Sequence, residues 1–244
     1  MNLIVDIGNT WIKVAVFDDF KIIYQDKAKP KYFLNKLEWL SHEYPHLENM
    51  IYAASGHTNT EWIKYFNAHY KVFILNHKTP LNFINTYETP HTLGLDRLAL
   101  VAAADKLYTD KNVLIIDAGT CITYDLKSSK KIYCGGNISP GISMRFKALN
   151  KFTASLPLLK LEKPKSSPLG KSTKDAILNG VIQGVVYEIE QNIQRYKTDY
   201  SDLTVILTGG DQQYLSAQLK NSIFATSNFQ LIGLNAILEN LLND

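Results

Sequence analysis

Two short turns in this sequence place a carboxylate, a glycine and a threonine between strand-like segments. The first lies in LIVDIGNTWIKVAVF, residues 3–17, around Asp6, and the second in NVLIIDAGTCITYDL, residues 112–126, around Asp117. Glycine lets a phosphate approach backbone N–H groups, and a nearby carboxylate can hold Mg²⁺ or its water ligands. Gly and Asn also suit an ordinary hairpin turn, so each acid could be a turn residue without further function.

The recurrence of the turn favours a function. Asp6 and Asp117 are 111 residues apart in a chain of 244 residues, so the offset roughly halves the chain. We therefore expect two similar α/β halves facing each other across a cleft, whose two turns would hold a polyphosphate with help from Lys13. A third segment, TGGD at 208–211, has a glycine pair after an apolar run. Such a pair would let a flat ring such as adenine lie against the backbone.

Apolar periodicity predicts the elements that position these turns. Residues 3–17 are expected to form a hairpin, and 49–55 and 71–76 to form buried strands. Helices are expected over 32–44, 60–69, 93–108, 174–196 and 233–242, and after Pro140-Gly141. The helix at 174–196 has an apolar stripe at a spacing of four: Ile177, Val181, Val185, Ile189 and Ile193.

Composition excludes several classes of protein. The net charge of +3 is spread along the chain, which argues against nucleic acid as a partner. The sequence has no apolar run near the roughly 18 residues that a membrane span needs, and no leader-like N-terminus. The two cysteines, Cys121 and Cys134, have no metal-binding spacing, so no zinc site is expected. We expect a cytoplasmic protein with free thiols and no membrane partner.

The two turns and the late glycine pair resemble the nucleotide-binding signature of the acetate kinase, sugar kinase, Hsp70 and actin superfamily. A closer resemblance follows from five segments in order: DIGNTWIK at 6–13, LGLDR at 93–97, DAGTCITYD at 117–125, GGNISPG at 135–141 and TGGD at 208–211. Their order and approximate spacing resemble the type III pantothenate kinase family over nearly the whole chain. LGLDR and GGNISPG are more specific than the phosphate turns, because they shape the acceptor site in that family.

The resemblance implies a fold and an activity. It implies transfer of the γ-phosphate of ATP to pantothenate, giving 4′-phosphopantothenate, the first step of coenzyme A biosynthesis. The expected fold is α/β, with two duplicated ribonuclease H-like (actin-like ATPase) halves and a cleft between them, here 1–112 and 113–244. The resemblance further implies a homodimer, Mg²⁺ or another divalent cation with ATP, and a monovalent cation such as K⁺ or NH₄⁺.

The resemblance also implies roles for individual residues. Asp96 would be the general base, which suits an alcohol acceptor that must lose its proton as the phosphoryl group transfers. Asp117 would hold the monovalent cation, and Asp6 would hold Mg²⁺ through water. The ATP-binding residues would be Asp6, Ile7, Gly8, Asn9, Thr10, Trp11, Ile12, Lys13 and Thr120. The residues that bind pantothenate would be Tyr87, Gly94, Leu95, Asp96, Arg97 and Thr173.

Some positions leave alternatives open. Asp96 could simply cap a helix, whereas Arg97 in a first helical turn is unfavourable for the helix dipole, which favours a ligand role. The sequence departs from the family pattern at Trp11, in TCITYD and in GKST, and the last change makes Thr173 the least secure assignment. Two rival functions remain: a kinase of another small hydroxy acid, and a non-catalytic nucleotide-binding regulatory or accessory protein of the same fold.

Overall fold

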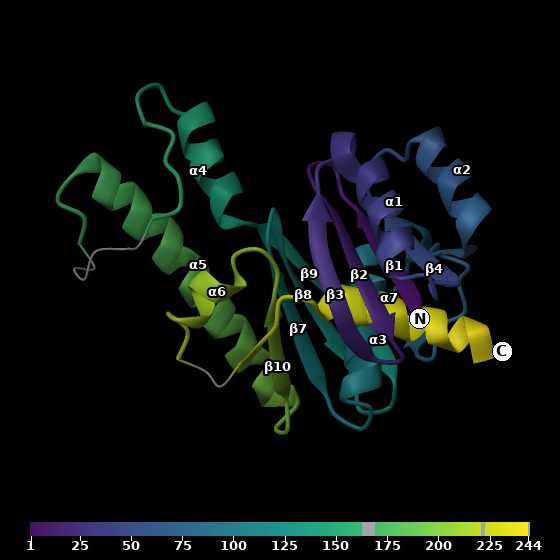
Figure 1. Cartoon of the computed structure of the whole chain (residues 1–244). Coiled ribbons are helices and arrows are strands. Elements are labelled where there is room, and N and C mark those ends of the chain that lie inside the picture. The colour runs from purple at the N-terminus through teal and green to yellow at the C-terminus, as the bar shows by residue number, and fades with distance from the viewer. Residues whose placement is uncertain (163–168, 221–222, 244) are drawn as a thin grey trace. The chain divides into compact units, whose positions relative to one another are not determined.

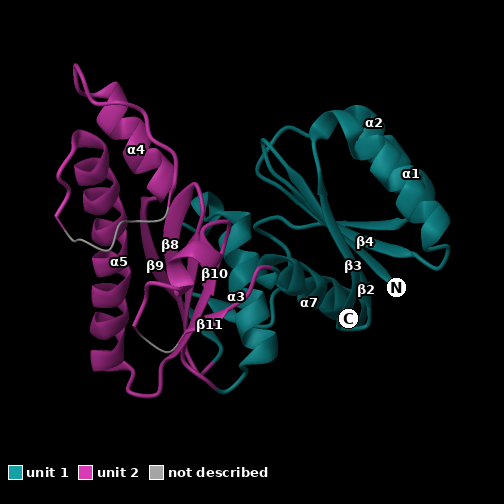
Figure 2. Ribbon diagram, turned by 60° about the vertical axis from the view of Figure 1, so that its left-hand side comes forward, with its two compact units in different colours: residues 1–110, 131–133, 228–244 teal, residues 111–130, 134–227 magenta. Residues whose placement is uncertain are grey.

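The chain is an α/β protein with two mixed sheets flanked by helices. The computed structural model describes residues 1–162, 169–220 and 223–243 (Figure 1). The chain divides into two compact units, coloured separately in Figure 2. Unit 1 comprises residues 1–110, 131–133 and 228–244, and unit 2 comprises residues 111–130 and 134–227. These units and the predicted halves at 1–112 and 113–244 divide the chain differently, and the halves stay a prediction.

Unit 1 is built on a five-stranded sheet in the order β3-β2-β1-β4-β5. β1 and β2 form the expected hairpin, with Asp6 opposite Lys13, and β1 pairs in parallel with β4. The strands are β1 (Asn2–Ile7), β2 (Ile12–Asp18), β3 (Lys21–Ala28), β4 (Asn49–Ala54) and β5 (Lys71–Ile74). Alternate residues of β1 point to opposite faces, so Leu3, Val5 and Ile7 share one core while Asp6 faces the other side.

Helices cover both faces of this sheet. The core that contains Leu3, Val5 and Ile7 is completed by α1 (Phe33–Glu43), which follows the short helix η1 (Pro30–Tyr32), and by α2 (Thr60–His69). α7 (Phe229–Asn243) lies against β1 and β4, where the Asn2 side chain donates to Asn235 Oδ1 at 3.0 Å. α7 also packs along α3 (Leu95–Leu107), which follows β6 (Ile84–Asn85) and η2 (Pro90–Thr92). The carboxyl end of the chain thus helps to close unit 1.

Unit 2 repeats the hairpin-plus-parallel-strand pattern. β7 pairs with β8 in antiparallel register, with Asp117 opposite Thr123, and pairs in parallel with β10, with Asp117 opposite Thr208. The elements are β7 (Val113–Ala118), β8 (Cys121–Lys127), β9 (Ile132–Pro140), α4 (Ile142–Lys151), α5 (Thr173–Asp199), β10 (Thr204–Thr208), α6 (Gln212–Ser216) and β11 (Phe224–Ala225). β9 starts in unit 1, where Ile132 and Tyr133 pair with β6, and continues into unit 2.

The sequence predicted most of these elements. The helix at 60–69 agrees with α2, and the stripe from Ile177 to Ile193 is buried in the core of unit 2. The interpretation of residues 71–76 as a buried strand is wrong, because β5 is an edge strand whose side chains are exposed or half-buried. No helix in the described part of the chain is both long enough and apolar enough to cross a bilayer.

The close approach of α7 to α3 requires a glycine. A Cβ at Gly233 would overlap the carbonyl of Ala99, whereas a Cβ at Gly184 in α5 would meet nothing within 4 Å. We expect Gly233→Ala to lower the free energy of unfolding by about 1–3 kcal/mol, because the two helices must move apart. Urea denaturation of both variants checks this. Gly184→Ala is the control, expected to be neutral or slightly stabilising, and equal midpoints for the two variants would contradict the packing.

Candidate functional site

The first turn is a four-residue connection closed by its own backbone. The Gly8 N–H donates to the Trp11 carbonyl at 3.1 Å, and a Cβ at Gly8 would lie 2.9 Å from that oxygen. The loop after β4 is hydrogen-bonded to the start of the turn: the N–H groups of Ser55 and Gly56 both donate to the Ile7 carbonyl, at 3.0 and 3.1 Å. The turn is therefore held from two strands, and glycine is needed at its entry.

Gly56 packs against the turn itself, and sequence reasoning missed it. A Cβ at Gly56 would lie 3.0–3.1 Å from Gly8 backbone atoms and from Asn9 Oδ1. The signal was present as a small-residue run, AASG at 53–56, directly after an apolar strand. Among the predicted ATP-binding residues, Asn9 and Thr10 are exposed at the tip, whereas Ile7 and Ile12 bury their side chains in the core. Those two could meet a ligand only through backbone atoms.

Asp6 carries a destabilised negative charge on the α7 side of the sheet. Its carboxylate lies 3.5 Å from the Lys13 ammonium, which also donates to Gln230 of α7 at 3.2 Å. Burial raises the pKa of Asp6, Lys13 lowers it in part, and the negative charge of Asp96 raises it further. Asp6 and Asp96, distant in sequence, therefore lie within electrostatic range of each other in unit 1. Gln230 was not predicted from the sequence.

Asp96 lies in the first turn of α3, and its neighbours fix its position. The Arg97 backbone N–H donates to Asp96 Oδ1 at 2.9 Å, and the Asp96 side chain is otherwise exposed. A Cβ at Gly94, the residue that precedes α3, would overlap Asp96 Oδ1. Gly94 therefore leaves the space that the carboxylate occupies. Asp96 does not act as the N-cap, which is Gly94, although its oxygen does bind a first-turn N–H group.

Arg97 is buried, with 3% of its surface exposed, and stacks on an aromatic pair. Its guanidinium lies 5.5 Å from the ring centroid of Tyr87. The Tyr87 ring is parallel to the Tyr133 ring, with centroids 6.2 Å apart and an interplanar angle of 6°. The stack joins the loop after β6, the first turn of α3 and the start of β9. The predicted residues Tyr87, Gly94, Asp96 and Arg97 are thus neighbours in unit 1.

The second turn, in unit 2, is packed against the segment GGNISPG. The Gly119 N–H donates to the Cys121 carbonyl at 2.9 Å, and the Gly141 N–H donates to the Thr120 carbonyl at 3.1 Å. A Cβ at Gly141 would overlap the carbonyl oxygens of Gly119 and Thr120. The glycine that ends GGNISPG is therefore required for contact with this turn. The Thr120 side chain is exposed.

The glycine pair of TGGD packs against the same turn from the adjacent strand. Gly209 has φ of +96°, which favours glycine, and a Cβ there would overlap both Asp117 Oδ1 and the Ala118 carbonyl. The Asp211 N–H donates to the Ala118 carbonyl at 2.9 Å, and burial raises the pKa of the Asp211 carboxyl. DAGT, GGNISPG and TGGD thus meet in unit 2. DAGT and TGGD were predicted to bind nucleotide, whereas GGNISPG was predicted to shape the acceptor site together with LGLDR.

Arg145 of α4 anchors GGNISPG, and sequence reasoning did not identify it. Its guanidinium donates to the Pro140 carbonyl at 2.9 Å, to Ser139 Oγ at 2.8 Å and to Glu188 Oε2 at 2.5 Å. The Tyr124 hydroxyl donates to the other Glu188 oxygen at 2.8 Å. Although burial opposes it, hydrogen bonds led by Arg145 hold the pKa of Glu188 below its usual value. The loop is thereby tied to β8 and α5.

Thr173 lies elsewhere in unit 2, at the first residue of α5. Ser172 is the N-cap, and its hydroxyl accepts from the Asp175 N–H at 3.1 Å. Thr173 is exposed and lines a cavity of about 760 Å³ together with Arg145 and residues of α4 and α5. It is therefore not part of the second turn.

Comparisons with known proteins agree on one family. A family model described as type III pantothenate kinase matches residues 2–195. The type III pantothenate kinase of Christiangramia forsetii is 48% identical over 98% of both chains, and that of Flavobacterium johnsoniae is 40% identical over 96% of both.

Solved structures of low sequence identity share the fold. A Campylobacter jejuni protein described as belonging to the Baf family of transcriptional activators has a TM-score of 0.65 at 22% identity, covering 99% of this chain and all of that one. A glucokinase from an Antarctic psychrotroph has a TM-score of 0.56 at 14% identity, covering 98% of both chains. The family model and the full-length relatives, rather than the fold, decide the assignment: the chain belongs to the type III pantothenate kinase family.

Proposed function

We propose that this protein phosphorylates pantothenate with ATP, giving 4′-phosphopantothenate and ADP in the first step of coenzyme A biosynthesis. The observation that carries the proposal is the position of Asp96. It is an exposed carboxylate in the first turn of α3, oriented by the Arg97 N–H, and it lies within electrostatic range of Asp6 beside the first turn. A base within electrostatic range of a phosphate-binding turn is the arrangement that phosphoryl transfer to an alcohol needs.

The proposed chemistry assigns one role to each acid. Asp96 accepts the proton of the primary hydroxyl of pantothenate while the hydroxyl oxygen bonds to the γ-phosphorus of ATP. The bond from that phosphorus to the β,γ-bridging oxygen breaks, and ADP leaves. Backbone N–H groups of Asn9 and Thr10, with the Lys13 ammonium, stabilise the phosphate charge, and Gly8 closes the turn that presents them. Gly94 keeps the Asp96 carboxylate in place for the proton transfer.

Pantothenate would be held beside Asp96. Arg97 supplies a positive charge for its carboxylate, and the Tyr87 ring supplies an apolar surface for its dimethyl group. The stack of Arg97 on Tyr87 supports this assignment, because it fixes a buried cation next to the proposed base. Gly94 and Leu95 would contribute backbone at the start of α3.

Asp6 is the residue of unit 1 best suited to Mg²⁺. Its carboxylate is destabilised by burial and by Asp96, so a bound cation would relieve an excess of negative charge. The described residues include no group of three or more His, Cys, Asp or Glu side chains that could hold a metal ion. Mg²⁺ bound by one carboxylate would complete its shell with phosphate oxygens and water. When bound, it would neutralise charge on the β- and γ-phosphates.

Asp117 and the Ala118 carbonyl suit a monovalent cation in unit 2. Both oxygens border the space that a Cβ at Gly209 would fill. A carboxylate and a carbonyl are hard oxygen ligands that could coordinate K⁺ or accept hydrogen bonds from NH₄⁺. The exposed Thr120 is assigned to ATP, and the backbone around Gly209 to the adenosine.

We further propose a homodimer in which Thr173 contributes to pantothenate binding near the interface, and a cytoplasmic location. Exposed apolar side chains on α4, on α5 and in the described parts of the segment between them support an interface. Large apolar side chains are exposed there at Met144, Phe152, Leu158, Leu169 and Tyr187.

Asp96→Asn tests the proposed base. ADP release would be measured in a coupled assay with ATP, Mg²⁺ and pantothenate, in K⁺ and in Na⁺. The variant should lower kcat by about 10²–10⁴-fold, because the acceptor hydroxyl loses its general base. ATP binding, measured by calorimetry, should persist. Asp110→Asn, which removes an exposed acid elsewhere in unit 1, is the matched control and should retain full activity.

The same assay separates the rival functions. ADP release by the wild-type protein that depends on another hydroxy acid but not on pantothenate would assign a different acceptor. ATP binding without release for any acceptor would favour a regulatory nucleotide-binding protein. Full turnover of pantothenate by Asp96→Asn would overturn the assignment of the base but not the assignment of the substrate.

Asp6→Asn should separate activity from stability. The folded-state pKa of Asp6 is raised, so ionisation of the carboxyl destabilises the fold as pH rises from the unfolded pKa through the folded one. The neutral amide should therefore raise Tm at pH 7.5 by about 2–4 °C, abolish most pantothenate-dependent turnover, and lose its stabilising effect near pH 3. Thermal melts at both pH values check this, with Asp18→Asn as an exposed control. A lower Tm at pH 7.5 would show that the Lys13 ion pair outweighs burial.

Asp117→Asn tests the monovalent cation site. Loss of the carboxylate charge should raise the KCl concentration for half-maximal activity about tenfold, equivalent to about 1.4 kcal/mol of cation binding. The comparison is a KCl titration at constant ionic strength, balanced with tetramethylammonium chloride. Asp199→Asn, at the end of α5, removes the same charge from unit 2 and should leave the titration unchanged. An unaltered K⁺ dependence in Asp117→Asn would show that the cation binds at another site.

A further inference from the structure

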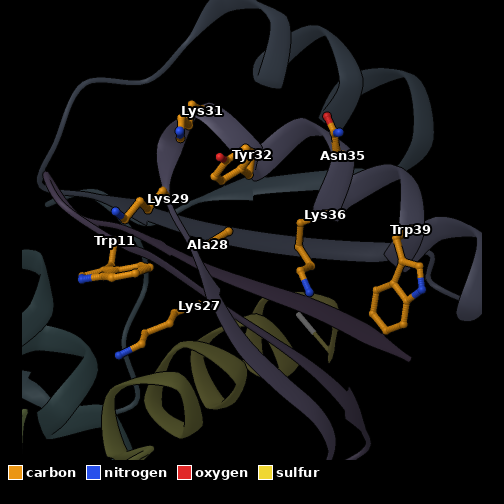
Figure 3. Close-up of a pocket in the computed structure, with 9 residues that line it drawn as sticks. All are labelled: Trp11, Lys27, Ala28, Lys29, Lys31, Tyr32, Asn35, Lys36 and Trp39. Carbon is orange, nitrogen blue, oxygen red and sulfur yellow. The ribbon is translucent and has the colours of Figure 1, made fainter.

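Unit 1 contains a pocket of about 480 Å³ outside the proposed acceptor site, between the edge strand β3 and helix α1 (Figure 3). Lysines and large aromatic residues line most of it. Trp11, Tyr32 and Trp39 are 39%, 55% and 42% exposed, which is high for side chains of this size. Lys27, Lys29, Lys31 and Lys36 line the same pocket.

One end of the pocket concentrates positive charge. The ammonium groups of Lys27 and Lys29 lie 5.0 and 5.6 Å from the centroid of the Trp11 ring, on opposite sides of it in Figure 3. The Lys31 ammonium lies 4.4 Å from the Tyr32 ring centroid. Contact with aromatic faces holds these cations but does not neutralise them. An anion would relieve the repulsion among them.

No acidic residue at the start of the adjacent helices η1 and α1 offsets this positive charge. Neither η1 nor α1 has an acidic residue in its first turn, and neither has a side-chain N-cap hydrogen bond. The positive end of the α1 dipole therefore adds to the three lysines. Ile7 of β1 pairs with Ile12 of β2, which pairs with Ala28 of β3. This end of the pocket therefore lies at the same end of the strands as the first turn.

The other end is electrically balanced and aromatic. The Lys36 ammonium lies 2.6 Å from Asp26 Oδ2 and 5.0 Å from the Trp39 ring centroid, so its charge is already paired. Trp39 stands at the end of the pocket opposite Trp11, with Tyr32 between them (Figure 3). A ligand that fits would carry anionic groups at one end and a flat ring at the other.

We propose that this pocket is a second nucleotide-binding site. It adjoins the proposed ATP donor site at Trp11, which lines the pocket and was also predicted to bind ATP, but the pocket's lysines lie outside the predicted ATP-binding residues. The phosphates bind at Lys27, Lys29 and Lys31, and the base lies against Tyr32 or Trp39. The volume suits one small ligand. The Asp26–Lys36 pair closes the basic stretch at the aromatic end, which favours a single nucleotide over a continuous nucleic-acid strand. The site does not depend on the proposed kinase activity.

Nuclear magnetic resonance of the full-length protein tests this proposal with ADP as the probe. The chain has three tryptophans, at 11, 39 and 62, each of which gives an indole N–H signal. Trp39 reports on the pocket and the buried Trp62 is the control, whereas Trp11 does not distinguish the two sites because it was also predicted to bind ATP. ADP should shift the Trp39 signal saturably and leave Trp62 unmoved. Adenosine and inorganic tripolyphosphate, which each supply one half of the ligand, should bind more weakly than ADP.

Two double variants locate the site. Lys29→Gln with Lys31→Gln should weaken the ADP-induced Trp39 shift about tenfold, because two exposed ion pairs are lost. Lys64→Gln with Lys78→Gln removes the same charge from exposed positions outside the pocket and should change nothing. In the kinase assay, the first pair should leave the KM for ATP unchanged.

Three results would overturn the proposal. The absence of a Trp39 shift at millimolar ADP would exclude a nucleotide site. A rise in the KM for ATP that parallels the weakened Trp39 shift would make the pocket an extension of the donor site. Tighter binding of a single-stranded oligonucleotide than of ADP, lost in Lys29→Gln with Lys31→Gln, would assign the pocket to nucleic acid.

Discussion

The contact between Gly233 and the Ala99 carbonyl is the constraint on which the proposed acceptor site depends. It allows α7 to lie directly on α3, one turn beyond Asp96. The same helix α7 packs on β1 and β4 and reaches Lys13 through Gln230. One helix from the end of the chain therefore sets the distance between the first turn and the start of α3. A larger side chain at residue 233 would move α3 away from α7, and with it the proposed base away from the proposed phosphate-binding turn.

Glycine has the same role in unit 2, where the contacts are between loops. Gly141 and Gly209 each pack against carbonyl oxygens of the second turn, so closely that a Cβ would overlap them. Backbone carbonyls and N–H groups are thus brought close together without intervening side chains. Arg145 then fixes the loop that carries Gly141, because its guanidinium binds Pro140 and Ser139 and is held by Glu188. This framework can present oxygen ligands in a fixed geometry.

The charge of Asp6 illustrates the conflict between stability and function. A carboxylate that is buried and close to a second acid destabilises the fold when it ionises, and Lys13 and Gln230 offset this in part. Such a residue is retained where a ligand will compensate for it. The pocket along β3 has the opposite charge, with three lysines held on aromatic rings. The two proposed sites therefore carry opposite charges, negative at Asp6 and positive in the pocket.

Apolar periodicity in the sequence predicts the local elements, because it depends on neighbours only a few residues apart. The β1–β2 hairpin, α2 and the buried stripe of α5 follow from such patterns. The order of the motifs indicated the family, because it can be compared without knowing which residues are in contact. The edge strands β3 and β6 were not predicted, because their short or mostly exposed segments lack a clear apolar signal.

Contacts between residues distant in the sequence became visible in the folded chain alone. The contact of Gln230 with Lys13, the support of the first turn by Gly56, and the anchoring of GGNISPG by Arg145 all join residues that no local pattern connects. The electrostatic coupling of Asp6 with Asp96 belongs to the same class. The physical reason is that close packing and burial depend on how helices and strands stack in space. Sequence spacing encodes that stacking only indirectly.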